Sequence, residues 1–337
     1  MEQNRTKRSE TNVMITCFLC VVFVLLLGQP GYAQEKTPKF PIRPMSFICP
    51  FVAGSTADMT ARLISKNAEK FLGQPIVVVN KTGGSGTLGI AAIASAKSDG
   101  YTFGYTSPSG MLVSPFVEKL PYHPLKDFQQ IIQYSEATFA IYVKGNSPFK
   151  DFKELVAYAR QNPNKLTYAT SGALSIVHIT MVQVAKKEDL KFRHLPFKGG
   201  PEIQAALLGG HVDFGVGDFN YSLFEVGEIK LLALLGESRR AEYPQIPTLK
   251  DLGYDRPDVP PAPIYQNVAG PNDIPQEVVK KLEEAFTLGT KEPAFINGLK
   301  EIRFPVVYRN SKDMTDYMAN YYEFYRKMLT EMDFGKK

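Results

Sequence analysis

The stretch PFVAGSTAD, residues 50–58, decides the fold, because it joins a short apolar strand to an amphipathic helix. Residues 45–49 have the pattern of a buried strand, and residues 59–72 have the spacing of a helix with one apolar face. A Gly-Ser-Thr turn at such a junction leaves backbone N–H groups unpaired at the start of the helix. Such groups bind anions, most simply a carboxylate or a phosphate. The stretch therefore predicts an anion-binding turn.

The same arrangement recurs further along the chain. A second strand, PIVVVN at residues 75–80, is followed by KTGGSGTLG at residues 81–89 and by another helical segment. Residues 84–89 also match the G-x-G-x-x-G pattern of dinucleotide sites, but the next strand, residues 101–106, has no acidic residue at its end to hold a ribose. We therefore expect the glycines to let the backbone approach a small anionic ligand closely, rather than a nucleotide.

Strands and helices alternate along the chain, which predicts an α/β fold with mostly parallel sheets flanked by helices. A strand at residues 137–143 opens a second series of such units, and the Pro-rich residues 256–263 end it. The strand at residues 264–269 then returns to the first series. These two crossings predict a discontinuous first domain, a hinge, and a ligand cleft between the domains. The expected domains are 40–135 plus 265–337, and 136–264.

The N-terminus predicts export. Basic residues precede an apolar run at residues 13–27, and Gly31-Tyr32-Ala33 follows, which is typical of a signal peptide (residues 1–33) cut after Ala33. The alternative is a membrane anchor, for which the run is short of the ~20 residues that a span needs. Cleavage would leave 304 residues with 36 basic and 32 acidic side chains, and this net charge of +4 gives no indication of nucleic-acid binding. Cys49 would be the remaining cysteine, so no disulfide is expected.

Several of these stretches carry a family resemblance. PF-x-A-G-x-x-x-D with the following A-R, then LGQPIVVVN-K-x-G-G-x-G-x-x-G, SDGYTF, LPFKGGPEIQAALLGGHVDF from Leu195 and ALLGESRRAEYPQIPTLKDLGY from Ala233 resemble the substrate-binding proteins of tripartite tricarboxylate transporters. These are the Bug-type, or TctC-like, periplasmic receptors. The resemblance implies a two-domain periplasmic-binding-protein (Venus flytrap) fold that captures a small carboxylate for a membrane permease. It implies a monomer in the periplasm that is not an enzyme and needs no cofactor.

We expect the ligand's carboxylate to accept hydrogen bonds from backbone N–H groups of residues 53–56 and 84–87 and from serine hydroxyls near them. No arginine lies in these turns, so dipoles and hydroxyls should replace a bidentate clamp. The histidines have no metal-ligand spacing, and no metal site is expected. The predicted ligand-binding residues are Phe51, Ala53, Gly54, Ser55, Thr56, Asp58, Gly84, Ser85, Gly86, Ser107, Ser171, Ser175, His178, Lys198, Gly199 and Asp218.

Some roles stay open at this point. Asp58 either complements the helix dipole and pairs with Arg62 or, as the resemblance implies, binds an amino group of the ligand or orders the loop, and the two roles are compatible. His178 is either buried structure or a ligand contact, and Lys198 either faces an anion or is solvated. A secreted serine hydrolase using Ser175 or Ser171 with His178 is the alternative function, although no G-x-S-x-G motif surrounds either serine.

The chain also departs from the family pattern. Leu174 stands where the family usually has glycine, Ser55 replaces the second of two glycines, and Val52 replaces a frequent proline. Each change alters the predicted ligand turns, so the identity of the ligand should not be copied from relatives.

Overall fold

A computed structural model describes residues 40–236, 239–240, 242–255, 259, 262 and 264–331. The predicted signal peptide and its cleavage site after Ala33 lie outside these residues. Within the described ranges, no helix combines the length and apolar character required to cross a membrane.

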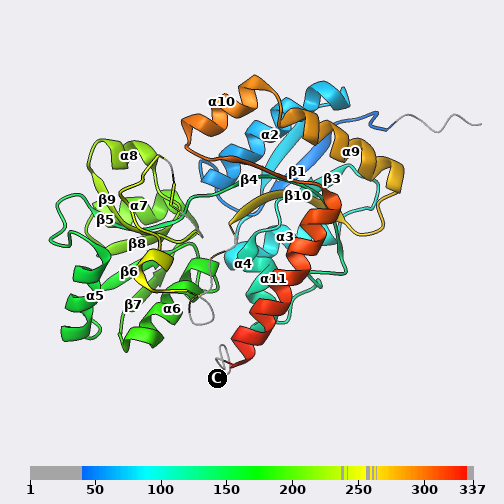
Figure 1. Ribbon diagram of the computed structural model, residues 1–337. Coiled ribbons are helices and arrows are strands. Elements are labelled where there is room, and N and C mark those ends of the chain that lie inside the picture. Colours follow the sequence, from blue (N-terminus) through cyan, green and yellow to red (C-terminus); the bar gives the residue numbers. More distant parts are fainter. Residues whose placement is uncertain are drawn as a thin grey trace, which may run out of the picture. The chain divides into compact units, whose positions relative to one another are not determined.

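The first of two sheets has six strands in the order β11-β4-β10-β3-β1-β2. β1 runs parallel to β2 and β3, whereas β10 is antiparallel to β3 and β4, and β11 is antiparallel to β4. Figure 1 shows these strands between two layers of helices. The strands are β1 (Met45–Cys49), β2 (Ile76–Asn80), β3 (Thr102–Gly104), β4 (Phe128–Glu136), β10 (Tyr265–Pro271) and β11 (Val306–Arg309).

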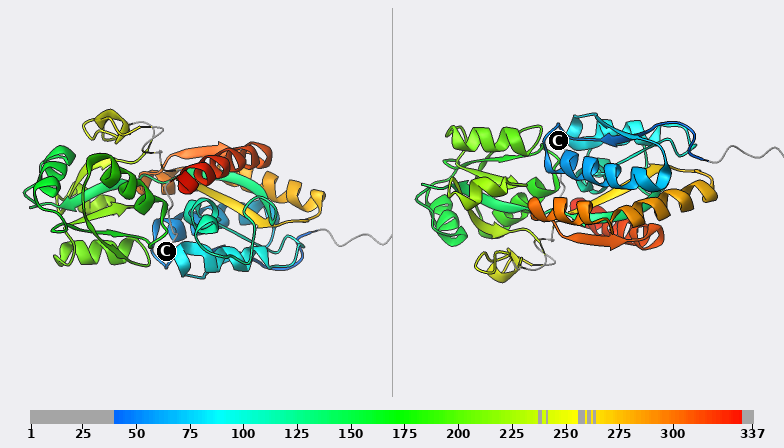
Figure 2. Two further views of the ribbon diagram at one scale, coloured as in Figure 1. Left: turned by 90° about the horizontal axis from the view of Figure 1, so that it is seen from below. Right: turned by 90° about the horizontal axis from the view of Figure 1, so that it is seen from above.

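Two groups of helices cover the faces of this sheet. α2 (Thr56–Leu72), α9 (Gln276–Gly289) and α10 (Pro293–Glu301) pack together on one face. α2 and α9 run side by side (Figures 1 and 2), and Gly289 allows the close approach, because a Cβ there would lie 3.2 Å from the Ala68 nitrogen. The other face carries α3 (Thr87–Ala94), α4 (Pro108–Leu112) and α11 (Ser311–Glu331).

The second sheet has five strands in the order β7-β6-β8-β5-β9. β6 is parallel to β7 and β8, and β5 is antiparallel to β8 and β9. The strands are β5 (Ala140–Lys144), β6 (Thr167–Thr170), β7 (Arg193–Pro196), β8 (Phe214–Gly217) and β9 (Ile229–Leu234). The helices are α5 (Phe152–Gln161), α6 (Ile176–Glu188), α7 (Gly200–Leu208) and α8 (Tyr221–Glu225).

The α/β architecture with two helix-flanked sheets is as predicted, but the expectation of mostly parallel sheets is wrong, because both sheets are mixed. The chain leaves the first sheet through β4 and returns through β10, and these two strands pair antiparallel to each other. Periodicity in the sequence predicts that a segment is a strand, but it does not give the direction in which that strand runs. Two strands and one α-helix among the described residues were not predicted: β4, β11 and α10.

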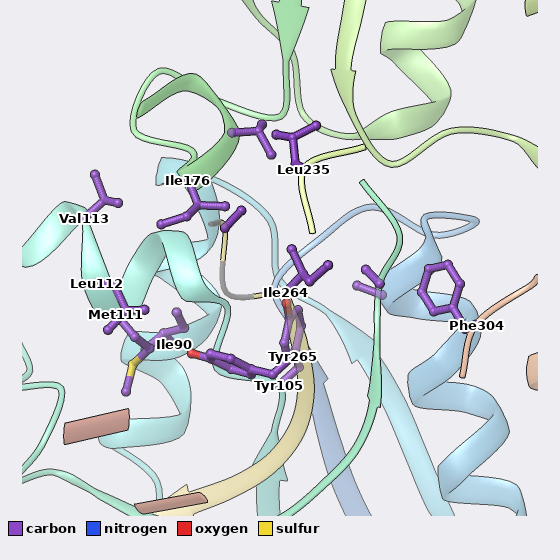
Figure 3. Close-up of a cluster of buried hydrophobic side chains, with 14 of the residues drawn as sticks. Ile90, Tyr105, Met111, Leu112, Val113, Ile176, Leu235, Ile264, Tyr265 and Phe304 are labelled. Carbon is purple, nitrogen blue, oxygen red and sulfur yellow. The ribbon is translucent and has the colours of Figure 1, made fainter. Parts of the chain in front are cut away.

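Buried side chains fill the space between the sheets and their helices. Figure 3 shows Tyr105, which follows β3, and Tyr265 of β10 in the same cluster as Ile176 of α6 and Leu235, which follows β9. The rings of Tyr105 and Tyr265 meet edge to face at 6.4 Å. Cys49, the one cysteine among the described residues, is fully buried at the end of β1, and burial raises the pKa of its thiol to about 12.

Candidate functional site

A small cavity of about 40 Å³ lies where strands of both sheets end. Residues after the carboxyl ends of β1, β3, β6 and β8 line it, as expected for ligand sites in open α/β sheets. Eight of the predicted residues line the cavity, namely Phe51, Ser55, Thr56, Ser107, Ser171, Ser175, Gly199 and Asp218. The other lining residues were not predicted: Ala57, Tyr105, Pro108, Ser109, Phe139, Ile176, Val177, Gly200 and Gln266.

α2 begins at Thr56 with Ser55 as its N-cap, so the helix starts three residues earlier than the apolar spacing predicts. Its hydroxyl accepts a hydrogen bond from the Asp58 N–H at 3.3 Å, which satisfies one of the unpaired donors at the helix start. The Gly54 N–H donates to Asp58 Oδ2 at 3.0 Å, and the Ser55 N–H donates to the Val52 carbonyl at 3.2 Å. The prediction that these two N–H groups are available to a ligand is therefore wrong, because acceptors within the turn already use them.

The Asp58 carboxylate orders this turn through hydrogen bonds. It is buried, and its carboxylate accepts hydrogen bonds from Arg62 Nε at 3.0 Å and Asn80 Nδ2 at 2.9 Å as well as from Gly54. Burial opposes ionisation of Asp58, but these three hydrogen bonds outweigh it and lower the pKa of the carboxyl. Asp58 does not line the cavity, so the structure favours the loop-ordering interpretation.

α6 begins in the same way on the other side of the cavity. Ser175 is its N-cap and accepts from the His178 N–H at 3.3 Å. The Ile176 N–H donates to the Ser109 hydroxyl of α4 at 3.0 Å, so a residue beside the first sheet contacts the start of this helix.

The second backbone N–H group of each helix, unlike the first and the third, has no hydrogen-bond acceptor among the described residues. Ala57 in α2 and Val177 in α6 both line the cavity, and neither backbone N–H has an acceptor within the part of the chain that the structure describes. These two donors are candidates for binding an anion at the helix starts. Neither residue was predicted, because an alanine and a valine give no chemical signal in the sequence.

His178 is part of a buried aromatic group rather than of the cavity lining. Its ring lies 3.8 Å from the His194 ring in a stacked arrangement, and its Nδ1 is 2.8 Å from the Tyr168 hydroxyl. Burial lowers the pKa of His178 to about 3 and that of His194 to about 4, so both are neutral at pH 7. The Ser175 hydroxyl donates to Thr170 Oγ1 at 3.1 Å, and this arrangement lends no support to a serine nucleophile with His178 as its base.

The remaining predicted residues lie outside the cavity lining. Ser85 has a left-handed backbone (φ 54°), and its hydroxyl accepts from the Leu174 N–H at 3.3 Å, which joins the glycine-rich turn to the β6–α6 turn. Lys198 is exposed, and its backbone N–H donates to Glu202. The predicted residues that do not line the cavity are Ala53, Gly54, Asp58, Gly84, Ser85, Gly86, His178 and Lys198.

Asp218 is the acidic residue of the cavity lining, and it follows β8 directly. The Thr56 hydroxyl donates to its Oδ2 at 3.1 Å, and the Thr56 backbone also bonds this carboxylate. A carboxylate from the second sheet therefore lies at the N-terminus of α2. Burial raises the pKa of Asp218 despite these hydrogen bonds.

Comparison with known proteins identifies the family. Residues 60–333 match the family described as tripartite tricarboxylate transporter family receptor, TctC. A UPF0065 protein from the gbd 5′ region of Cupriavidus necator is 35% identical over 289 residues, covering 85% of this chain and 86% of that protein.

Solved structures agree with this assignment. The periplasmic binding protein BugD superposes with a TM-score of 0.79 at 26% identity, covering 87% of this chain and 98% of that one. R. palustris Rpa4515, solved with adipate, has a TM-score of 0.77 at 26% identity, covering 86% and 97%. The predicted periplasmic-binding-protein fold is confirmed, and the chain belongs to the tripartite tricarboxylate transporter receptor family.

Proposed function

We propose that this protein is a periplasmic receptor that captures a small carboxylate-bearing molecule in the cavity and delivers it to a membrane permease. The observation that carries the proposal is the lining of the cavity: starts of helices from both sheets, serine hydroxyls, and no lysine or arginine among the described residues. The relative Rpa4515, solved with adipate, supports a carboxylate as the ligand.

The α6 end of the cavity suits the ligand's carboxylate best. The Val177 N–H and the Ser171 hydroxyl make no hydrogen bond within the described protein, and the α6 dipole places partial positive charge beside them. A carboxylate that accepts from these donors gains charge-assisted hydrogen bonds without an arginine. Asp58, Lys198 and the glycine-rich turn would then support the cavity instead of contacting the ligand.

Binding should require the cleft to open and close. A cavity of about 40 Å³ holds only a few water molecules, so a carboxylate needs a wider entrance. Hydrogen bonds of Thr56 with Asp218, Ser85 with Leu174 and Ser109 with Ile176 hold the two sides together. We propose that residues 40–135 plus 265–337 move as one domain against residues 136–264, and that the ligand favours the closed state through its contacts with both.

The remaining parts of the proposal concern the protein's setting. The chain would be exported by cleavage after Ala33 and act as a monomer without cofactor or metal. It would release its ligand unchanged, because the arrangement around Ser175 and His178 supports binding rather than turnover.

The experiment compares acids with their carboxamides by titration calorimetry. The probes are succinate, glutarate, adipate and the ω-amino acids of four to six carbons, each with the derivative in which a carboxylate is replaced by an amide. At least one acid should bind roughly ten- to hundredfold more tightly than its amide, because hydrogen bonds from the Val177 N–H and the Ser171 hydroxyl are charge-assisted when a carboxylate accepts them and not when a neutral amide does. Equal affinity of acid and amide throughout the series, or no binding at all, would overturn the proposed function.

A further inference from the structure

Asp218 is held in place at the cavity by several neighbouring residues. Gly217, with φ 137°, turns the chain at the end of β8, and the Tyr142 hydroxyl donates to the Asp218 carbonyl at 3.1 Å. Gly200 at the start of α7 makes room for the carboxylate, because a Cβ at Gly200 would lie 2.4 Å from Asp218 Oδ2. Gly217 and Tyr142 therefore hold the Asp218 backbone at the end of β8, and Gly200 leaves the space that its carboxylate occupies.

The charge of Asp218 has no countercharge nearby among the described residues. No described lysine or arginine forms an ion pair with it, and no other charged side chain of the described chain lines the cavity. The Thr56 hydroxyl and backbone are its donors from across the cleft. A dicarboxylate in this small cavity would place a second negative charge close to Asp218, and the repulsion would disfavour it. A positively charged group at the same place would gain an ion pair.

The two ends of the cavity therefore favour ligand groups of opposite charge. The α2 end carries the Asp218 carboxylate, whereas the α6 end offers the Val177 N–H and the Ser171 hydroxyl. Gln266, only 2% exposed, adds a buried amide to the lining, and its Oε1 accepts from Thr60 at 3.4 Å. A ligand with one negative and one positive end matches this polarity in a single orientation.

We propose that Asp218 is a specificity-determining residue that selects a small amino-carboxylate, whose ammonium group pairs with Asp218 while its carboxylate binds the start of α6. This inference rests on the proposed receptor function and narrows its ligand class. Dicarboxylates of equal length are then poor ligands.

Matched probes of equal length test this selection by titration calorimetry. They are 4-aminobutyrate against succinate, 5-aminopentanoate against glutarate, and 6-aminohexanoate against adipate. The wild-type protein should prefer an amino member of a pair by roughly tenfold or more, and Asp218→Asn should lower that preference roughly ten- to hundredfold. Asn has the same shape and still accepts from Thr56, so the change removes charge with little effect on packing.

Two further variants complete the experiment. Asp316→Asn removes an exposed carboxylate on α11, with 60% of its side chain accessible, and should leave the preference unchanged. Gly200→Ala keeps the charge but displaces the Asp218 carboxylate, and should also reduce the preference. Tighter binding of a dicarboxylate by wild type, or an unchanged preference in Asp218→Asn, would overturn the inference while leaving the receptor function intact. If no acid of either class binds, both proposals fail.

Discussion

The starts of α2 and α6 are built alike and differ in what reaches them across the cavity. In each, an N-cap serine accepts from the third N–H, and the second residue lines the cavity with a backbone N–H that has no acceptor among the described residues. The first residue of α2 meets the Asp218 carboxylate, whereas the first residue of α6 meets the neutral hydroxyl of Ser109. The comparison teaches that two helix starts with the same backbone geometry can favour ligand groups of opposite charge. The difference comes from one side chain, Asp218, at the start of α2.

The turn before α2 also depends on charge in a way that the turn before α6 does not. Asp58→Asn removes the ionised acceptor shared by Arg62, Asn80 and Gly54. We expect the free energy of unfolding at pH 7 to fall by about 1.5–3 kcal/mol, the range for hydrogen bonds to charged groups. Urea denaturation measures the loss, and an unchanged midpoint would show that the network adds nothing to stability.

The N-caps provide the matched test of backbone geometry. Ser55→Ala and Ser175→Ala each remove one capping hydrogen bond, and each should lower the free energy of unfolding by about 0.5–2 kcal/mol. Ser175→Ala should weaken binding of the best acid in the series more than Ser55→Ala does, because the carboxylate is expected at α6. Calorimetry on both variants decides this, and a larger binding loss in Ser55→Ala would reverse the assigned orientation.

Asp218→Asn should change the free energy of unfolding at pH 7 in the opposite direction from Asp58→Asn. Burial raises the pKa of Asp218 in the folded state, so at pH 7 its ionised form is less favourable in the folded than in the unfolded chain. The substitution should therefore stabilise the protein at pH 7, by less than Asp58→Asn destabilises it. As the pH falls towards about 4 the folded wild type takes up the proton first, so the gain should disappear.

Thermal unfolding of both proteins at pH 7 and pH 4 measures this difference. His178 and His194 contribute stability above their unfolded pKa of about 6.5 that is lost as the pH falls, since burial lowers their folded values. This loss is common to wild type and variant and cancels when they are compared. A variant that is less stable than wild type at pH 7 would contradict the expectation.

The smallest effect on stability is expected at Ser85. Ser85→Gly removes the hydroxyl that accepts from Leu174 but also relieves a left-handed backbone at a non-glycine residue, so the two effects should nearly cancel. The closed arrangement should loosen, and small-angle scattering of the ligand-free protein should give a larger radius of gyration. Ser109→Ala, which removes the bond to Ile176, should act in the same direction. An unchanged radius in both variants would show that these bonds do not hold the cleft closed.

Most strands and helices could be predicted from periodicity, and the exceptions have a physical cause. The sequence does not predict β4, because buried polar residues interrupt its apolar pattern. Asn267 of β10 donates to one of them, Gln130, at Oε1 (2.8 Å), and to Thr106 Oγ1, which follows β3 (2.8 Å). In the sequence alone, a strand with hydrogen-bonded polar residues inside a sheet has the same polar pattern as a loop. Only the partner strand, far along the chain, explains it.

The site shows the same limit. Serines after strands are visible in the sequence, and Ser55, Ser107, Ser171 and Ser175 do line the cavity. Which N–H groups remain available depends on acceptors elsewhere in the fold. The sequence suggests the Gly54 N–H as a ligand donor although Asp58 accepts from it, and it gives no sign of the Ala57 and Val177 N–H groups. Every residue except proline has a backbone N–H, so the residue type does not show which N–H groups are available to a ligand. Only the tertiary structure shows this.

The buried Cys49 makes this receptor suited to optical measurement. Cys17 and Cys20 lie in the predicted signal peptide, so Cys49 would be the single thiol of the exported protein, and its high pKa keeps it unreactive. Cysteines introduced at the exposed positions Leu88 and Val226, 61% and 73% accessible, could then accept a donor and an acceptor dye without background labelling. Energy transfer between the dyes would follow capture of an amino-carboxylate in real time.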